Sequence, residues 1–174
     1  VIEFNARFGD PETEVVLPKL TSDLVPASPP FSTAKPPEFT WDESNATLGV
    51  VIASNGYPEN VIKGARVPEI EVDEDSHVYY AGVASDEHGN LVANSGRVLL
   101  VETSAPDIKS AQDKVYAIID KLELRGLFYR HDIGVQSAEV SCAAHLLRCG
   151  ALEVPSYVVA FRALHLHHTT HFRR

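Results

Sequence analysis

The sequence predicts an α+β fold in which mostly antiparallel strands carry one covering helix. Residues 45–103 contain short apolar runs separated by turn-forming residues, as in an antiparallel β domain. Residues 106–124 contain apolar residues at the spacing of one helix face. A strand-and-helix unit is predicted before them, at residues 1–25, so the chain is expected to hold one small domain and part of another.

The first predicted strand alternates between apolar and polar side chains along residues 1–8. Its polar face carries Glu3, Asn5 and Arg7, which strand geometry spaces about 6–7 Å apart. Glu3 and Asn5 offer the hard oxygen ligands that Mg²⁺ prefers, and the guanidinium of Arg7 suits a phosphate or a carboxylate. Taken alone, the pattern more commonly indicates an amphipathic edge strand whose polar residues merely face water.

A helix is predicted next, over residues 11–24. Gly9 and Asp10 end the strand, and Asp10 is expected to cap the helix with Pro11 at its first position. Pro18 should kink this helix or start a new turn. Residues 26–44 then form a linker, because their prolines make the segment stiff and non-helical.

The second domain is predicted over residues 45–134. Strands are expected at residues 47–54, 78–85, 91–94, 97–102 and 127–129, with a weaker alternation at 67–72. Residues 55–58 form a turn, and residues 86–90, which include Gly89, close a hairpin. The helix of residues 106–124 has Asp107 in its first turn, where a negative charge suits the helix dipole, and is expected to cover the sheet.

Composition excludes several classes of function. The formal net charge of −9 argues against nucleic acid or an anionic membrane as a partner, and no apolar run reaches membrane-spanning length. Two cysteines do not make a disulfide scaffold, so a reducing, cytoplasmic setting is expected. The chain has no methionine and begins at Val1 inside a predicted strand, which predicts that it is a piece of a longer polypeptide.

Five stretches, in a fixed order, carry a resemblance to a known family. The first and most specific is Val1-Ile-Glu3-Phe-Asn5-Ala-Arg7-Phe-Gly9-Asp10-Pro-Glu-Thr13. The others are Gly49-Val-Val-Ile-Ala-Ser-Asn-Gly56-Tyr57-Pro58, Tyr80-Ala-Gly82, Ser95-Gly96-Arg97-Val-Leu99 and Gly126-Leu-Phe-Tyr129-Arg130-His-Asp132-Ile-Gly134. Together they resemble the phosphoribosylamine–glycine ligases, or glycinamide ribonucleotide synthetases, of the ATP-grasp superfamily, over residues 1 to about 134.

The resemblance implies a fold and a reaction. Residues 1–25 would be the end of an ATP-grasp domain, and residues 45–134 the C-terminal α+β domain of the ligase. The family joins glycine to 5-phosphoribosylamine at the expense of ATP, giving glycinamide ribonucleotide, ADP and phosphate in purine synthesis. Because the ATP-clamping part of the family would lie upstream of Val1, the 174-residue chain alone is expected to be inactive.

The resemblance also implies site residues. Glu3 and Asn5 would hold Mg²⁺ or Mn²⁺, Arg7 would be catalytic, and Gly9, Asp10 and Arg97 would bind substrate. The chain departs from the family at Ser95, which stands where the family has Gly. It departs again at Tyr80 and Val83, where the family often has His and Thr.

Residues 135–174 lie beyond the resemblance and form an unmatched tail. Cys142, His145 and Cys149 would share one helical face, so a zinc site is chemically possible, although an apolar helix with buried thiols is the more common meaning of such a pattern. Two alternative functions therefore stay open. One is a different ATP-grasp carboxylate–amine ligase, and the other is a non-enzymatic α+β binding module with a metal-binding tail.

Overall fold

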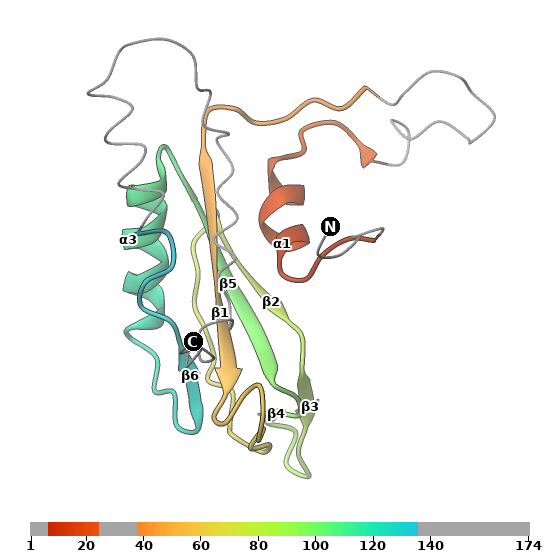
Figure 1. Ribbon diagram of the computed structural model, residues 1–174, viewed down its shortest axis with the longest axis vertical. Coiled ribbons are helices and arrows are strands. Elements are labelled where there is room, and N and C mark those ends of the chain that lie inside the picture. Colours follow the sequence, from red (N-terminus) through yellow and green to blue (C-terminus); the bar gives the residue numbers. More distant parts are fainter. Residues whose placement is uncertain (1–6, 25–37, 136–174) are drawn as a thin grey trace, which may run out of the picture.

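A computed structural model describes residues 7–24 and 38–135 (Figure 1). Along the chain it contains α1 (Glu12–Val16), a short 3₁₀ helix η1 (Leu17–Lys19), β1 (Ala46–Ser54), β2 (Ser76–Tyr80), β3 (Val83–Ser85), β4 (Leu91–Ala93), β5 (Arg97–Ala105), α3 (Ile108–Ile119) and β6 (Leu127–Tyr129). The predicted ligands Glu3 and Asn5, most of the predicted linker, and Cys142, His145 and Cys149 lie outside the described residues.

Four strands form one antiparallel sheet in the order β2-β5-β1-β6, and β3 and β4 form a separate hairpin. β1 and β5 pair over nearly their full length, with Val50 opposite Val101. The helix α3 covers one face of this sheet (Figure 1). Side chains of β1, β5 and α3 form the core between them, among them Leu48, Ile52, Leu99, Val115 and Ile119. The predicted α+β class and covering helix are confirmed.

The helix α3 begins where its sequence favours a cap. The carboxylate of Asp107 accepts a hydrogen bond from the backbone N–H of Ser110, at 2.8 Å, and so satisfies an otherwise unpaired donor of the first turn. The helix ends at Ile119 rather than at residue 124 as predicted. Leu122 and Leu124 still pack against the core from the following turn, which is why the apolar spacing runs past the helix end.

Two strand predictions were wrong in detail. The strand expected at residues 78–85 is interrupted, because the chain turns at Gly82 between β2 and β3. A side chain at Gly82 would collide with Ser95, so the backbone approaches that segment more closely than a regular strand allows. Residues 67–72 form no named strand: the N–H of Val67 donates to the carbonyl of Leu91 at 2.9 Å, and the isolated bridge beside it joins Arg66, one residue earlier, to Val92.

The N-terminal helix is also shorter than predicted. A new 3₁₀ turn, η1, begins at Leu17 with Pro18 as its second residue, in line with one of the two expected effects of this proline, but the chain is already extended at Leu20. Asp10 is not the helix cap, and Pro11 occupies the N-cap position instead, with no side-chain hydrogen bond to the helix. Asp10 is held elsewhere, as described below.

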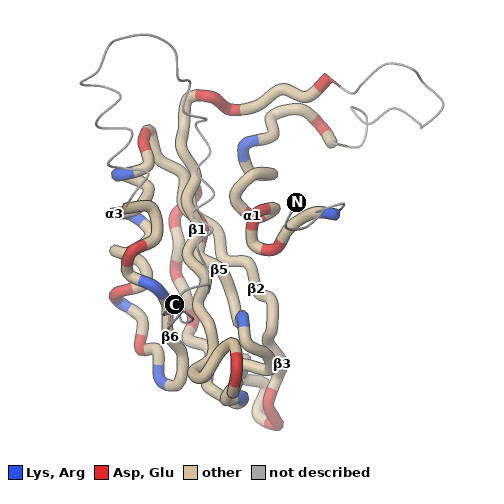
Figure 2. The backbone as a smooth tube through the Cα atoms, in the orientation of Figure 1, with Lys and Arg blue, Asp and Glu red and all other residues tan. Residues whose placement is uncertain are grey.

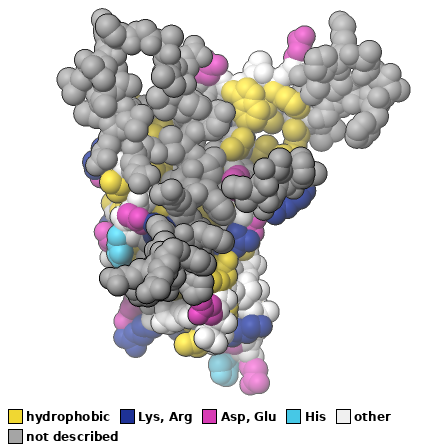
Figure 3. Space-filling model, viewed as in Figure 1, with side chains coloured by type: hydrophobic (Ala, Val, Ile, Leu, Met, Phe, Trp, Pro, Cys, Tyr) yellow, Lys and Arg dark blue, Asp and Glu magenta, His cyan; other side chains and the backbone are white. Residues whose placement is uncertain are grey.

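The helix α1 lies on the face of the sheet opposite α3 (Figure 1). Val15 is buried there, and a Cβ placed on Gly49 of β1 would stand 2.7 Å from Val15 Cγ1 and 3.1 Å from the methyl carbons of Leu100. Above α1, hydrophobic side chains gather on the surface shown in Figure 3. Among the described helices, none combines the length and apolar character needed to cross a membrane.

Candidate functional site

Four of the six predicted site residues lie in the described part of the chain: Arg7, Gly9, Asp10 and Arg97. The first three belong to the motif loop, which we define as residues 7–11. Arg7 is exposed, and its Nη1 donates a hydrogen bond to the carbonyl of Phe8 at 3.0 Å. Its guanidinium therefore stands at the surface of the loop, available to an anion in solution.

Gly9 sits where the motif loop meets α1. Its carbonyl accepts hydrogen bonds from the backbone N–H of Thr13, at 3.2 Å, and from the Thr13 hydroxyl. A side chain at this position would collide with the carboxylate of Glu12. The carboxylate of Glu12 therefore lies directly against the backbone of Gly9, and this close approach requires a residue without a side chain.

Asp10 and Arg97 contact each other across the two parts of the chain. Nη1 of Arg97 donates to the carbonyl oxygen of Asp10 at 2.6 Å, and Nη2 lies 3.3 Å from the carboxylate oxygen Oδ2. Their side chains are 32% and 53% exposed. The structure thus brings together two residues that were predicted to share one site and that are 87 positions apart in sequence.

A bulge in β5 aims Arg97 at the motif loop. Ile52 pairs with Leu99 but Ala53 pairs with Arg97, so Val98 is the extra residue in the ladder. In a regular strand Arg97 and Leu100 would point to opposite faces. The bulge instead puts Arg97 opposite Ala53, on the face that carries Leu100 and α1.

The other four stretches that carry the family resemblance are joined to one another by hydrogen bonds beside Arg97. The hydroxyl of Ser54 donates to the carbonyl of Ser95 at 2.8 Å, and the Ser54 N–H donates to the carbonyl of Gly96 at 2.8 Å. The N–H of Gly82 donates to the carbonyl of Arg97 at 3.0 Å, and the N–H of Asn55 donates to the carbonyl of Gly126 at 3.0 Å. The stretches therefore build one support for Arg97.

A buried carboxylate lies on the same face of the sheet. Glu102 of β5 has a side chain with no exposed surface, and its Oε2 stands 3.0 Å from Nδ1 of His77 on β2. Burial raises the pKa of Glu102, while the contacts with His77 and Ser104 oppose the rise. Burial, followed by the charges of Glu102 and Glu14, raises the pKa of the neighbouring Tyr79.

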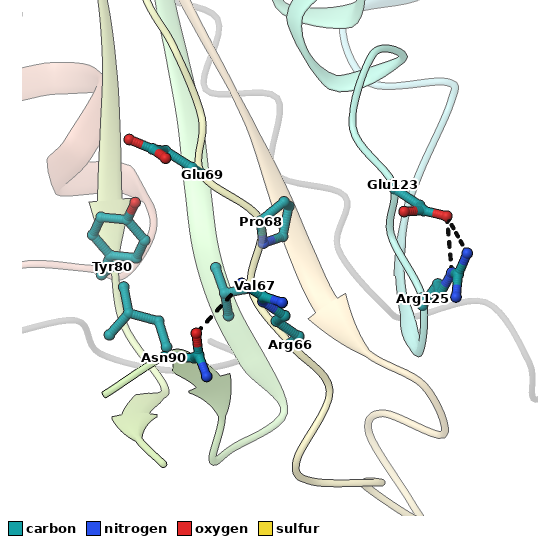
Figure 4. A pocket seen from close by; sticks show the side chains of 9 residues that line it. Arg66, Val67, Pro68, Glu69, Tyr80, Asn90, Glu123 and Arg125 are labelled. Atoms are coloured by element: carbon teal, nitrogen blue, oxygen red, sulfur yellow. Dashed lines mark hydrogen bonds and ion pairs between the residues drawn. The ribbon is translucent and has the colours of Figure 1, made fainter. Parts of the chain in front are cut away.

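A pocket of about 540 Å³ lies on the α3 side of the sheet (Figure 4). Figure 4 shows Arg66, Val67 and Pro68 between Tyr80 on one side and the Glu123–Arg125 pair on the other. No sequence pattern predicted this pocket, because its residues come from segments with no common motif. Arg66 donates to the side-chain oxygen of Asn90 and Arg125 pairs with Glu123, so both guanidinium groups already have partners.

Charged residues elsewhere pair at the surface. β1 carries none, while acidic and basic residues lie along α3 and the loops (Figure 2). Nζ of Lys114 on α3 stands 3.1 Å from Asp73 and 3.6 Å from Asp75. Within residues 7–24 and 38–135 there is no group of three or more His, Cys, Asp or Glu side chains that could hold a metal ion.

Comparison with known proteins identifies related sequences and a related structure. The family model described as "Phosphoribosylglycinamide synthetase, C domain" matches residues 47–136. Among curated proteins, the phosphoribosylamine–glycine ligase of Lactococcus lactis subsp. lactis is 52% identical over 133 residues, which is 76% of this chain and 32% of that protein. The corresponding ligase of Halalkalibacterium halodurans is 50% identical over 135 residues, covering 77% and 31%.

A solved structure agrees with the sequence matches. The crystal structure of phosphoribosylamine–glycine ligase from Thermotoga maritima has a TM-score of 0.57 and 32% identity, covering 76% of this chain and 32% of that one. This chain therefore spans about a third of the length of the relatives that it matches.

Proposed function

The chain belongs to the phosphoribosylglycinamide synthetase family through its C domain, and on that premise we propose that it is the C-terminal region of a phosphoribosylamine–glycine ligase. The proposed reaction joins glycine to 5-phosphoribosylamine, with ATP giving ADP and phosphate, as a step of purine synthesis in the cytoplasm. The observation that carries the proposal is the contact between Arg97 and Asp10, because it ties the family-matched domain to the motif loop.

The proposed organisation has four parts. Residues 1–25 form the end of an ATP-grasp domain, residues 26–44 a linker, residues 45–134 the C-terminal domain and residues 135–174 a tail. The docking of α1 on β1 and β5 supports a fixed arrangement of the first part on the third.

We assign the chemistry to the motif row and the loop that follows it. Glu3 and Asn5 would hold Mg²⁺ or Mn²⁺, because a carboxylate and an amide oxygen are the hard ligands that such ions prefer. Such an ion would neutralise charge at the phosphates of ATP, where transfer to a carboxylate would otherwise face strong repulsion. We assign the binding of phosphate and substrate to residues of the motif loop.

Three features of the loop bear on its proposed roles in binding. The exposed guanidinium of Arg7 suits the transferred phosphate, since its planar fork matches phosphate oxygens. Gly9 adds no side chain to the loop, and the Glu12 carboxylate that packs against it would have to move aside for a substrate to reach its backbone. The half-exposed carboxylate of Asp10 suits the ammonium group of glycine, and Arg97 contacts the same residue.

The test uses the complete polypeptide, with the ATP-grasp portion upstream of Val1. ADP release should require both glycine and 5-phosphoribosylamine. Glu3→Ala and Asn5→Ala should each raise the Mg²⁺ concentration needed for half-maximal rate by at least tenfold, on the order of a lost metal-ligand contact. Glu59→Ala, an exposed glutamate in the turn after β1, is the matched control and should leave the Mg²⁺ requirement unchanged.

Other outcomes would redirect the assignment. Equal ADP release with other amino acids or amines would indicate a different ATP-grasp ligase. Glycine-dependent ADP release from the 174-residue chain alone would contradict the expectation that this region is inactive by itself. Stoichiometric zinc that survives chelation and is lost in Cys142→Ser would instead favour a metal-binding tail.

A further inference from the structure

We propose that Arg97 is a positioning residue that holds the motif loop in place, and that it acts on the reaction through Asp10 rather than by touching a substrate. The inference rests on the proposed function, because it concerns the geometry of the same site. Three observations lead to it: what Arg97 contacts, what holds Arg97, and what else holds the loop.

Arg97 contacts both the backbone and the side chain of Asp10. One nitrogen, Nη1, donates to the backbone carbonyl of Asp10 at 2.6 Å, and the other, Nη2, lies 3.3 Å from the carboxylate of the same residue. A guanidinium that uses both nitrogens on one residue fixes the orientation of that residue as well as its distance. The contact with the carbonyl restrains the backbone of the loop, which a pairing of charges alone would not do.

Arg97 is itself fixed by the sheet. Its backbone carbonyl accepts hydrogen bonds from the Gly82 N–H at 3.0 Å and from the Ser95 hydroxyl at 3.1 Å. Gly96, directly before it, packs so tightly against the ring of Tyr57 that a side chain there would collide with the ring. The bulge at Val98 sets the face to which Arg97 points. The sheet therefore fixes the position of Arg97, and Arg97 in turn restrains the motif loop.

Within the described residues the motif loop has few other restraints. The helix α1 that follows it is five residues long and has no side-chain cap. The other contacts near its start are the hydrogen bonds from Thr13 to Gly9 and the packing of the Glu12 carboxylate against Gly9. Loss of the Arg97 contacts would therefore let the loop shift, and with it Arg7, which directly follows the segment predicted to hold the metal ligands Glu3 and Asn5. A displacement of about 1 Å in a catalytic group can cost on the order of 100-fold in rate.

Kinetics of the complete polypeptide test the proposal. Arg97→Gln should lower kcat by roughly 10- to 100-fold while changing KM for ATP, glycine and 5-phosphoribosylamine by less than about twofold. Arg97→Lys keeps the charge but has a single donor nitrogen, which cannot reach the carbonyl and the carboxylate of Asp10 as a fork does. It should therefore recover only part of the lost kcat. The double variant Arg97→Gln/Asp10→Asn should lose less than the product of the two single losses, because the partners act as one unit.

Arg130 provides the matched control. It pairs with Asp132, and the two side chains are 32% and 61% exposed, close to the values for Arg97 and Asp10. Arg130→Gln should leave kcat unchanged. A rise in KM for one substrate with kcat intact in Arg97→Gln would show that Arg97 binds that substrate directly. Such a rise, or fully multiplicative losses in the double variant, would overturn the proposal.

Hydrogen exchange separates this proposal from the proposed function. The amide of Thr13 is bonded to Gly9 in the loop, so Arg97→Gln should accelerate its exchange by about tenfold or more while Arg130→Gln does not. If the wild-type polypeptide shows no glycine ligation, the proposed function fails, yet the exchange rates still decide whether Arg97 anchors the loop. Unchanged exchange at Thr13 in Arg97→Gln would overturn the anchoring role whatever the activity.

Discussion

We define the sheet body as β1, β2, β5, β6 and α3, and the motif arm as residues 7–19. The two regions differ in whether every buried polar side chain has a hydrogen-bond partner among the described residues. Polar groups inside the sheet body have partners: the Thr103 hydroxyl donates to the carbonyl of Ala111 at 2.9 Å, and the Gln112 amide donates to that of Ile133 at 2.7 Å. In the motif arm, Glu14 Oε2 is buried without a hydrogen-bond partner within the described residues.

The same contrast appears in the helices. α3 has twelve residues, a side-chain cap and an apolar face buried against the sheet. α1 has five residues and no side-chain cap, and its buried residue is Val15. A helix this short is not stable by itself, so its position depends on docking. The proposed chemistry is therefore carried by the part with the least structure of its own, and the sheet body supplies the rigidity.

The largest effect should come from the core of the sheet body. Ile52→Ala removes a fully buried side chain from β1 and should lower the free energy of unfolding by about 2–5 kcal/mol. Phe8→Ala in the motif arm, where the ring is 68% exposed, should change it by less than about 0.5 kcal/mol. Urea denaturation followed by circular dichroism measures both. Similar losses for the two variants would remove the distinction between the regions.

A second variant tests the contact between the two regions. Gly49→Ala places a Cβ within 2.7 Å of Val15 Cγ1, and such overpacking typically costs about 1–3 kcal/mol. We expect the motif arm to yield first, so that limited proteolysis cuts near α1 while the sheet melts almost as before. The double variant Gly49→Ala/Val15→Ala makes room for the added methyl and should restore part of the protection. Continued fast cleavage in the double variant would contradict the docking of α1 at this point.

The two helices also differ in their N-terminal caps. Asp107→Ala removes the cap of α3 and should cost about 1 kcal/mol at neutral pH. Hydrogen bonds from Ser110 lower the pKa of Asp107, so this cost should be present above the unfolded pKa and vanish as the pH falls through the lower folded value. Asp10→Ala removes no cap, and its exposed pairing should contribute less than about 1 kcal/mol. Thermal melts at several pH values separate the two variants.

The sequence predicted the sheet body better than the motif arm, for physical reasons. Strand periodicity and turn residues such as Gly89 are local, and they located β1, β5, β6 and the β3–β4 hairpin. Helix lengths were too long, because Leu122 and Leu124 keep an apolar spacing in a turn that also faces the core.

The geometry of the candidate site could not be predicted in the same way. The pairing of Asp10 with Arg97 depends on a bulge at Val98, and the position of a bulge is set by the register between strands rather than by either strand alone. Asp10 looked like a helix cap because Asp is favoured before a helix, but a guanidinium brought from a distant segment holds it instead.

The smallest effect concerns a buried charge beneath the motif arm. The carboxylate of Glu102 has no exposed surface, and burial raises its pKa above the usual value of 4.5. The folded state then binds a proton more tightly than the unfolded state, so the free energy of unfolding should fall as the pH rises from 4.5 through the folded pKa.

Glu102→Gln has no proton to lose, so it should flatten this part of the stability profile. The Gln amide oxygen can still accept from Nδ1 of His77, and the shape of the side chain is kept, so stability below pH 4.5 should barely change. Urea denaturation at half-unit pH steps measures the slope, with the exposed Glu74→Gln as the matched control. An unaltered slope in Glu102→Gln would mean that the contacts with His77 and Ser104 cancel the effect of burial, so that folding leaves the pKa of this carboxyl unchanged.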